Sequence, residues 1–375
     1  MEKKILCVIQ SNNFIYGAGR SFRTAMNNLQ KPFDLIVPKA LYGDKSEDHI
    51  EAEIRKYFNS NLEKIYIEYL PYAMCFYGKK SIRITGRIYI FLKNLLYQIK
   101  KHRLKKIFKN YSCIYINSLV LYPLLGMTNK GVIHIREKLD INFFQKQPIK
   151  KKLQAAQKVI FISYDTKASL SELGIDGVIL NNPFDMTAVN AVDIKVAKKK
   201  YGISENDTVF AVLGKTYAIR GVDFIAKTFS LLREKKCKLL IVGDLDTELG
   251  NMLHRISKSD SRIILTGEQK DVYEIYAISD YIVRGESVFS VGRTIYEGLY
   301  SGCRVIAPGD YKKDSKKIME YQNFKEQIIF YKPRDAKSFF EVLSVAAKSK
   351  VVDNKVGKSN LATFSKSFNQ ILEND

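Results

Sequence analysis

Residues suited to chemistry are concentrated between Gly285 and Gly309, where a glycine-containing loop leads into a helical pattern and then an apolar strand. The loop ends in Ser290-Val291-Gly292-Arg293, and Glu297 falls one turn into the helix. The first N–H groups of a helix have no partner within it and carry the positive end of its dipole, so they bind anions. We predict that this loop end binds phosphate and that Glu297 accepts hydrogen bonds from vicinal ribose hydroxyls. An early acidic residue also favours the helix dipole without any ligand.

A second loop carries two fixed cations. Gly214, Lys215, Arg220 and Gly221 directly follow an apolar strand and precede a helical pattern. Two cations five residues apart can converge on a diphosphate and stabilise it as a leaving group. The alternative is a solvated basic loop in a lysine-rich chain. We take Lys215 and Arg220 as candidate catalytic residues, Gly214 as a donor-binding residue, and a nucleotide diphosphate as the ligand.

A third loop, Gly17-Ala18-Gly19-Arg20-Ser21, lies shortly after the first apolar run and opens a helical pattern. Small residues let backbone N–H groups approach a phosphate or sugar closely, so Gly17 and Gly19 are candidate donor-binding residues. A glycine loop of this kind is also an ordinary turn and helix cap. It is not a full dinucleotide fingerprint, because the third glycine and the acidic residue are missing.

These loops require an alternating α/β framework to position them. Strand-like runs such as Ile5 to Ile9 and Phe33 to Val37 alternate with helical patterns such as Ser21 to Leu29, which favours parallel sheets with helical crossovers. The pattern restarts at Thr208 after a polar, lysine-rich stretch. We predict an acceptor-binding Rossmann-like domain over 1–185, a linker over 186–206 and a nucleotide-sugar-binding domain over 207–350. A C-terminal helix within 351–375 is expected to pack back toward the first domain.

Composition narrows the class of protein. A chain of 375 residues with 46% hydrophobic and 12% aromatic residues can fill two cores. Its five cysteines are odd in number, widely spaced and set mostly in apolar runs, which favours buried thiols in a reducing compartment. No signal peptide or membrane-spanning run is recognisable. We expect a cytoplasmic protein.

Half of the net charge of +22 lies in one segment, Lys79 to Asn110, which holds eleven Lys or Arg residues and no Asp or Glu. Five apolar residues in it share one helical face: Ile88, Phe91, Leu92, Leu95 and Ile99. A cationic amphipathic helix can rest on an anionic membrane leaflet, which places the protein on the inner face of the plasma membrane. Alternatively, the stripe packs on a sheet and the lysines are solvated. We expect no nucleic acid as a partner, because no recognised binding module accompanies the charge.

The order of motifs in the second half resembles a family 4 glycosyltransferase of the GT-B fold, among the glycosyl transferases group 1. The matching features, in chain order, are Gly214-Lys215 with Arg220-Gly221, Ile241-Val242-Gly243, Thr266-Gly267, Asp271-Val272 with Tyr276, Ser279-Asp280, and Gly292-Arg293 with Glu297. The resemblance implies two Rossmann-like doubly wound domains facing a central cleft, and retaining sugar transfer from a nucleotide diphosphate donor. It also places Gly267, Glu268 and Gln269 beside the base of the donor.

The first half resembles the acceptor domain of the same family more faintly. In the family a histidine after a strand lies at the reaction centre; the match here is His134 or, by a two-residue slip, Arg136, and we take His134 as catalytic. The family signature also places an acid eight residues before Glu297, where this chain has Phe289. Either Glu286, three residues earlier, reaches the sugar as a catalytic residue, or Ser290 and backbone groups replace the missing acid.

The resemblance implies a hexosyltransferase that uses a nucleotide sugar and a saccharide or lipid-linked saccharide acceptor in cell-surface polysaccharide biosynthesis. Asp244-Leu245-Asp246 imitates an Asp-x-Asp metal motif, but it stands where a turn or helix cap is expected. With two cations available for the leaving group, we predict a metal-independent enzyme without a cofactor. The alternatives are a nucleotide-sugar epimerase of the same fold and a non-catalytic basic protein that binds membranes or RNA.

Overall fold

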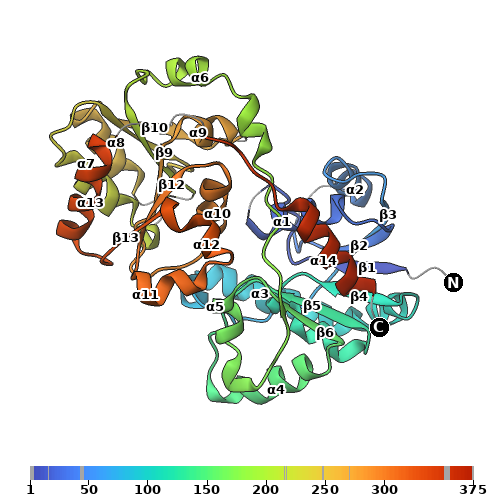
Figure 1. Cartoon of the computed structure of the whole chain (residues 1–375). Helices are drawn as coiled ribbons and strands as arrows, with labels where there is room; N and C mark the ends of the chain where they lie inside the picture. The colour runs from blue at the N-terminus through green and yellow to red at the C-terminus, as the bar shows by residue number, and fades with distance from the viewer. Residues whose placement is uncertain are drawn as a thin grey trace. The chain divides into compact units, whose positions relative to one another are not determined.

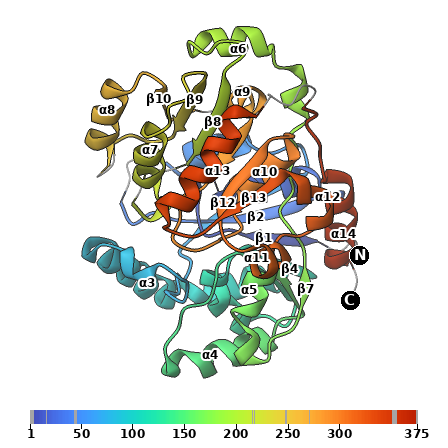
Figure 2. The same ribbon diagram turned by 60° about the vertical axis from the view of Figure 1, so that its left-hand side comes forward.

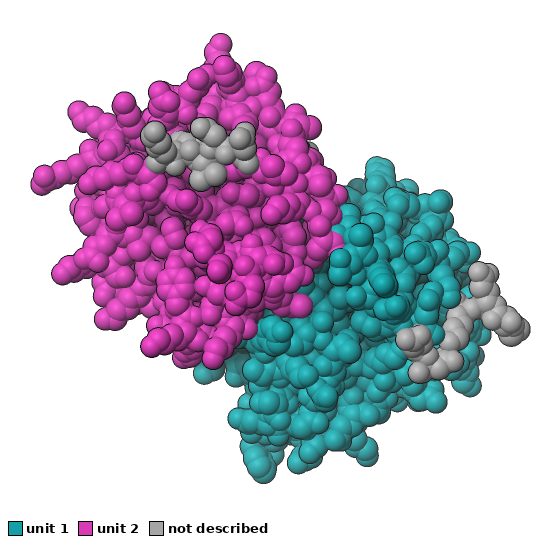
Figure 3. All heavy atoms as spheres, in the orientation of Figure 1, with its two compact units in different colours: residues 1–183, 361–375 teal, residues 184–360 magenta. Residues whose placement is uncertain are grey.

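The protein is described by a computed structural model that covers residues 4–15, 17–42, 46–214, 216, 218–246, 249–269, 271–349 and 355–373 (Figure 1). The chain divides into two compact units (Figure 3). Unit 1 comprises residues 1–183 and 361–375, and unit 2 comprises residues 184–360. Each unit is built on its own parallel sheet, as the alternation of strand and helix patterns predicts.

In the described part of unit 1, seven parallel strands pair in the order β3-β2-β1-β4-β5-β6-β7. The strands are β1 (Ile5–Val8), β2 (Phe33–Pro38), β3 (Leu62–Glu68), β4 (Cys113–Ile116), β5 (Gly131–Ile135), β6 (Lys158–Phe161) and β7 (Val178–Ile179). The helices are α1 (Gly17–Asn27), α2 (Glu47–Arg55), α3 (Ile84–Phe108), α4 (Phe143–Gln154), α5 (Tyr164–Ala168) and α14 (Leu361–Glu373), with 3₁₀ turns η1 (Lys79–Ser81), η2 (Leu119–Met127) and η3 (Ser171–Leu173).

Strands β1, β2, β4 and β5 of unit 1 are buried on both faces, because helices cover each side of the sheet. Along β1, Ile5 and Cys7 face the core shared with α1, α2 and α14. Leu6 and Val8 face the opposite core, shared with α3, η2 and α4, which lie on the same side of the sheet (Figure 2). The continuous apolar runs of the sequence therefore correspond to strands that lie between two helical layers.

Unit 2 contains, within the described residues, a six-stranded parallel sheet in the order β10-β9-β8-β11-β12-β13. The strands are β8 (Thr208–Leu213), β9 (Cys237–Val242), β10 (Ile263–Gly267), β11 (Tyr281–Val283), β12 (Arg304–Pro308) and β13 (Ile328–Tyr331). The helices are α6 (Ile194–Lys200), α7 (Val222–Ser230), α8 (Gly250–Ser259), α9 (Tyr273–Ile278), α10 (Arg293–Tyr300), α11 (Tyr311–Asp314), α12 (Tyr321–Phe324) and α13 (Ala336–Lys348). Its 3₁₀ turns are η4 (Thr187–Ala191), η5 (Ala218–Arg220), η6 (Ser315–Lys317) and η7 (Lys325–Gln327).

Two segments near the unit boundary bear on the predicted division into domains: one departs from the prediction and the other agrees with it. The stretch 186–206, expected to be a linker, contains η4 and α6 and belongs to unit 2. It is ordered because Val189, Ala197 and Ile203 are buried in the core of that unit, and because the Asp193 side chain caps α6. After residue 360 the chain returns to unit 1, where α14 buries Phe364 and Phe368 against α1 and β4.

Within the described ranges, none of the helices combines the length and the apolar character that crossing a bilayer requires. The five cysteines are buried thiols. Burial raises the pKa of Cys75 to about 12 and the pKa values of Cys237 and Cys303 to about 11.

Candidate functional site

The two motif loops of unit 2 meet at the carboxyl edge of its sheet, because β8 and β11, the strands that precede them, are neighbours. The contact is made through backbone. Gly221 has φ +65°, and a Cβ on it would lie 1.9 Å from the carbonyl oxygen of Gly285. A Cβ on Gly285 would lie 2.5 Å from the carbonyl oxygen of Gly221. Only glycine at both positions allows this approach, which brings Arg220 beside Glu286.

Glu286 lies between two guanidinium groups. Arg284 Nε donates to Glu286 Oε1 at 3.0 Å and to Oε2 at 3.1 Å, and Arg284 Nη2 also contacts Oε1. Arg220 Nη1 donates to Oε1 at 3.2 Å. Burial acts to raise the pKa of Glu286, but Arg284 and Arg220 outweigh it, so the pKa lies below its ordinary value. The carboxylate is therefore ionised at neutral pH, and the cluster of Arg284, Glu286 and Arg220 carries one net positive charge.

The two arginines of this cluster differ in exposure. Arg284 is buried, and it also donates to Thr294 Oγ1 in the first turn of α10, while its own carbonyl oxygen accepts from Tyr331 Oη at 2.7 Å. The side chain of Arg220 is 54% exposed. Arg284 thus fixes the geometry of the loop, and Arg220 presents a guanidinium to solvent. Arg284 was not among the residues singled out from the sequence; its only signal there is a basic residue directly after an apolar strand.

The N-terminus of α10 lies beside this cluster. The N-cap residue of α10 is Gly292, which has no side chain to make a capping bond, so no cap side chain bonds the first N–H groups of the helix. A Cβ on Gly292 would lie 3.2 Å from Arg284 Nη1, which places the helix start against the arginine. Ser290, Val291 and Arg293 are partly exposed. Phe289, at the position of the missing acid, is buried and packs against Phe330 with ring centroids 5.2 Å apart.

Glu297 is buried and already bonded within unit 2. Its Oε1 accepts from Arg293 Nε at 3.1 Å and Nη2 at 2.9 Å, and its Oε2 accepts from Tyr276 Oη at 2.9 Å. The guanidinium carbon of Arg293 also lies 4.9 Å from the centroid of the Phe184 ring. A ribose that bonds Glu297 has to displace Arg293 or Tyr276, or share the carboxylate with them. The ribose contact stays a prediction.

The other predicted donor residues lie at neighbouring strand ends. Gly214 has φ +121° and is exposed directly after β8, whereas Lys215 lies outside the described residues. Gly267 ends β10 with φ +69°, Glu268 is exposed, and the Gln269 side chain donates to the carbonyl oxygen of Thr266 at 2.8 Å. The strand β9 separates this group from Gly214.

A small pocket opens between the two loops of unit 2. The residues that line it are Val212, Leu213, Gly214, Arg220, Val222, Val283, Arg284 and Glu286. Two guanidinium groups, one carboxylate and several apolar side chains therefore line this pocket. It lies at the carboxyl edge of the sheet, where open α/β sheets bind their ligands.

The glycines of the first loop serve different purposes. Gly17 opens α1 with φ +53° and is exposed, with no neighbour within 4 Å of a Cβ built on it. Gly19 is buried, and a Cβ there would lie 1.7 Å from the carbonyl oxygen of Asn13. The packing of α1 against the loop before it is therefore sufficient to require glycine at position 19. Of the two glycines, only Gly17 is exposed enough to contact a donor substrate.

His134 lies in the core of unit 1, and its predicted place at the reaction centre stays a prediction. It is within β5 and fully buried, and its Nδ1 lies 2.8 Å from Tyr115 Oη and 3.3 Å from Arg136 Nη2. Burial and the adjacent Arg136 hold the pKa of His134 well below its usual range, so its imidazole is neutral. The strand places His134 one position before its end, whereas Arg136 follows the strand and is partly exposed.

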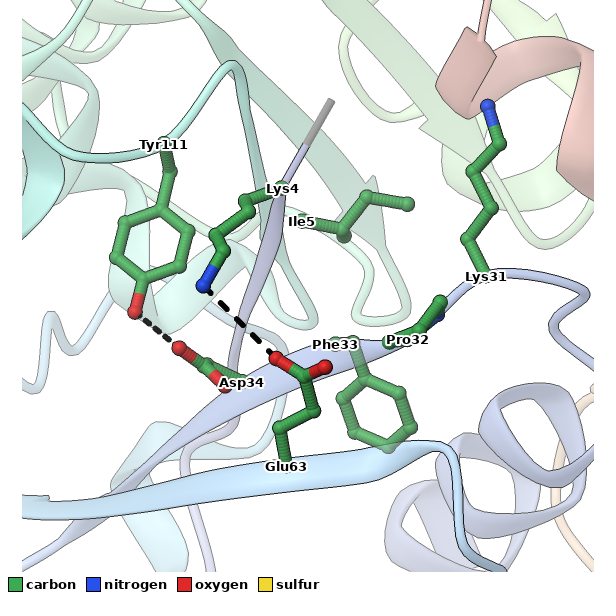
Figure 4. Close-up of a pocket in the computed structure, with 8 residues that line it drawn as sticks. All are labelled: Lys4, Ile5, Lys31, Pro32, Phe33, Asp34, Glu63 and Tyr111. Atoms are coloured by element: carbon green, nitrogen blue, oxygen red, sulfur yellow. Dashed lines mark hydrogen bonds and ion pairs between the residues drawn. The ribbon is translucent and has the colours of Figure 1, made fainter. Parts of the chain in front are cut away.

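Another pocket lies at the opposite, amino edge of the unit 1 sheet (Figure 4). Tyr111 points at the buried Asp34, its hydroxyl donating to Oδ2, and the backbone N–H of Lys64 donates to Oδ1 at 3.0 Å. Lys4 points at Glu63, with Nζ 3.9 Å from Oε2. Burial, with the Asp34 bond, raises the pKa of Tyr111. The polar groups here satisfy one another and connect strands β1, β2 and β3, which is a structural role.

Among the described residues, no group of three or more His, Cys, Asp or Glu side chains is placed to hold a metal ion. Asp244 instead accepts from the backbone N–H of Asp246 at 2.9 Å, which is the bond of a local turn.

Comparison with known proteins identifies the family of a part of unit 2. The model for glycosyl transferases group 1 matches residues 207–347, a range that contains the cation loop, Arg284, Glu286 and α10. Residues 207–347 are a glycosyl transferases group 1 domain. The predicted resemblance is confirmed by this match.

Three similar proteins extend the comparison. N-acetyl-alpha-D-glucosaminyl L-malate synthase of Bacillus anthracis is 27% identical over 113 residues, which cover 29% of this chain and 29% of that protein. The structure of Anabaena HepE in complex with UDP and glucose has a TM-score of 0.68 at 14% identity, covering 100% of both chains. The structure of WaaG, a glycosyltransferase involved in lipopolysaccharide biosynthesis, has a TM-score of 0.62 at 12% identity, covering 99% of this chain and 100% of that one. These structures confirm the predicted two-domain GT-B fold, of which residues 207–347 form part of the second domain.

Proposed function

We propose that the protein is a retaining, metal-independent glycosyltransferase that moves a sugar from a nucleotide diphosphate donor to a saccharide or lipid-linked saccharide in cell-surface polysaccharide assembly. The observation that carries this proposal is the meeting of Arg220, the Arg284–Glu286 pair and the start of α10 at one sheet edge of the group 1 domain. The UDP and glucose bound to HepE, and the role of WaaG in lipopolysaccharide biosynthesis, support this choice of donor and product.

Each group of the cluster has a role in this reaction. The bond between the anomeric carbon and the diphosphate breaks, and its electron pair leaves with the diphosphate. The acceptor hydroxyl bonds to the same carbon and passes its proton to the departing diphosphate. Negative charge grows on the departing diphosphate, where the exposed Arg220 and the first N–H groups of α10 stabilise it. Lys215 is the proposed second cation. Arg284 orients Glu286 and the helix start, and the retained configuration is inferred from the family resemblance.

We further propose that α3 holds the protein on an anionic membrane surface near a lipid-linked acceptor. Four of the five residues of its apolar stripe face solvent, in contrast to the alternative that the stripe packs on the sheet: Ile88, Phe91, Leu95 and Ile99 are 49–66% exposed, and Leu92 is partly exposed. Ile84, at the start of the helix, is 75% exposed. The buried residues of α3 are Lys93, Tyr97, Leu104 and Phe108, so its first nine residues bury no side chain. Phe143 and Phe144, at the start of α4 on the same side of the sheet, are 80% and 85% exposed.

The charge around this stripe selects the surface that it binds. The segment from Lys79 to Asn110 has eleven cations and no acid, and each Lys or Arg near an anionic leaflet contributes about 1 kcal/mol. Exposed aliphatic and aromatic side chains between those cations suit the boundary between headgroups and acyl chains.

Calorimetric titration of UDP and GDP into the full chain tests the donor site. Removing a charge-assisted contact costs about 1.5–3 kcal/mol, so Arg220→Gln is expected to weaken binding roughly 10- to 100-fold. Lys56→Gln, an exposed cation on unit 1, is the matched control. Unchanged affinity in Arg220→Gln contradicts the donor site, and NMR analysis of products separates transfer, which needs an acceptor, from epimerisation, which does not.

A further inference from the structure

Arg136 is a partly buried cation at the carboxyl edge of the unit 1 sheet, and neutral groups hold it. Its Nε donates to Asn117 Oδ1 at 2.7 Å and its Nη1 to Asn182 Oδ1. Its Nη2 lies 3.3 Å from His134 Nδ1 and 3.4 Å from Tyr115 Oη. Arginine has five N–H donors, so these four contacts leave it able to bond a further acceptor.

Arg136 differs in this respect from the other well-packed arginines of the chain. Each of three others is paired with a carboxylate: Arg262 with Asp260, Arg284 with Glu286, and Arg293 with Glu297. In the described part of the chain no carboxylate forms an ion pair with Arg136. The adjacent carboxylate, Glu137, accepts from Ser118 Oγ at 2.5 Å and from the backbone N–H of Leu119 at 2.9 Å instead.

Asn117 supplies a second, independent sign of a missing partner. Its Oδ1 accepts from Arg136 Nε and from Tyr115 Oη at 3.1 Å, and these two donors fix the orientation of the amide. The other end of the amide, Nδ2, is therefore a donor, and it is buried without an acceptor. The residue is fully buried, directly after β4, and its backbone N–H bonds the Val8 carbonyl oxygen of the neighbouring strand at 2.9 Å. A buried donor without an acceptor is uncommon in folded proteins.

His134 contributes by positioning Arg136. A guanidinium can only donate, so Nδ1 of His134 has to accept from it, and the imidazole proton resides on Nε2. The histidine singled out from the sequence thus acts through the arginine two residues later.

We propose that Arg136 and Asn117 Nδ2 form an oxyanion subsite of unit 1, which takes a carboxylate or phosphate group carried by the sugar acceptor. A charged, flat oxyanion supplies what both residues lack: a counter-ion for Arg136 and a hydrogen-bond acceptor for Asn117 Nδ2. The assignment to the acceptor rests on the proposed transfer reaction, whereas anion binding itself does not.

The test is anion binding to the full chain, measured by calorimetry and thermal shift. Inorganic phosphate and malonate are the probes, and potassium chloride of equal ionic strength is the reference. Wild type and Lys56→Gln are expected to bind one of the two anions and to gain thermal stability with its concentration. Because the donor site of unit 2 is also expected to bind phosphate, only the affinity that Asn117→Asp removes is assigned to this subsite. A larger loss for malonate assigns a carboxylated acceptor, and a larger loss for phosphate assigns a phosphorylated one.

Asn117→Asp is the decisive variant. It keeps the shape of the side chain, replaces the Nδ2 donor with an acceptor and supplies a counter-ion for Arg136. Its affinity for the preferred anion is expected to fall at least 10-fold, without loss of thermal stability in chloride. Arg136→Gln is expected to lose anion binding as well, and Arg136→Lys to recover part of it. Full anion binding by Asn117→Asp, or no binding of either anion by wild type, overturns the subsite.

Titration with UDP separates this proposal from the donor site. Asn117→Asp is expected to bind UDP as wild type does, because the nucleotide belongs to unit 2. Equal losses of UDP and anion affinity overturn the assignment to the acceptor. If wild type binds the anion but no nucleotide, the subsite stands and the proposed function is contradicted. If wild type binds UDP but neither anion, the proposed function stands and the subsite is contradicted.

Discussion

Replacing Arg284 by glutamine is expected to destabilise unit 2 far more than the same replacement of Arg220. Both side chains bond the same oxygen of Glu286, but Arg284 is buried and the side chain of Arg220 is 54% exposed. Removing one partner of a buried ion pair costs about 3–5 kcal/mol, because the other charge is left buried and uncompensated. Removing a partner at the surface costs about 0–1 kcal/mol.

The size of the effect can be stated for thermal unfolding. Unit 2 spans residues 184–360, and in a domain of this size 1 kcal/mol shifts the midpoint by about 2–4 °C. Arg284→Gln should therefore lower the melting temperature of unit 2 by about 6–20 °C, and Arg220→Gln by no more than about 4 °C. Hydrogen exchange of peptides that cover β11 and α10 localises the loss, because Arg284 bonds Thr294 in the first turn of α10.

The pH dependence of stability shows whether the unpaired Glu286 carboxylate causes the loss in Arg284→Gln. The pKa of Glu286 is depressed in the folded protein, so its contribution is present above the unfolded pKa of about 4.3 and is lost as pH falls through the lower folded value. Without Arg284, burial should raise the folded pKa of Glu286. The stability difference between wild type and Arg284→Gln should then shrink in acid, and adding Glu286→Gln to the variant should recover most of the loss at pH 7. A loss equal to that of Arg220→Gln, or no recovery in the double variant, refutes this reasoning.

Three further predictions follow from single features. The pKa of His134 in the folded protein lies well below its unfolded value of about 6.5, so its contribution to the free energy of unfolding falls by about 1.4 kcal/mol per pH unit as the pH drops below 6.5. His134→Gln should therefore flatten the dependence of melting temperature on pH between 6.5 and 5. An unchanged slope contradicts a neutral, buried histidine. Gly221→Ala should abolish UDP binding and destabilise unit 2, because its Cβ meets the Gly285 carbonyl group. Gly202→Ala, also in unit 2 and with no neighbour within 4 Å of its Cβ, should cost only the strain of its positive φ, and equal effects of the two variants contradict the loop contact. Phe91→Glu should reduce flotation with vesicles rich in anionic lipid without changing UDP affinity, and unchanged flotation contradicts the membrane role of α3.

The fold could be predicted from the sequence because its signals are local. Apolar runs at Ile5 and Thr208 mark the first strand of each sheet. The backbone contact between Gly221 and Gly285 was not predicted, because it joins two loops that lie far apart in the sequence. The order of motifs from Gly214 to Glu297 was sufficient to indicate the family, which the match over residues 207–347 confirms.

The side-chain partners could not be predicted, since they depend on contacts across the sheet. The local signal of Arg284, a basic residue directly after an apolar strand, does not identify its partners, and its importance comes from its bonds to Glu286 and Thr294. His134 has the spacing of a reaction-centre residue, but β5 ends one residue after it and directs it into the core. Glu297 pairs with Arg293 one turn earlier, a contact that helical spacing permits but does not require.

A crystal structure of the full chain with UDP tests the central claim most directly. The diphosphate is expected beside the Arg220 guanidinium and the N–H groups of Gly292 and Arg293, with Arg284 still paired to Glu286. A diphosphate bound away from the start of α10, or bound to unit 1 alone, contradicts the account.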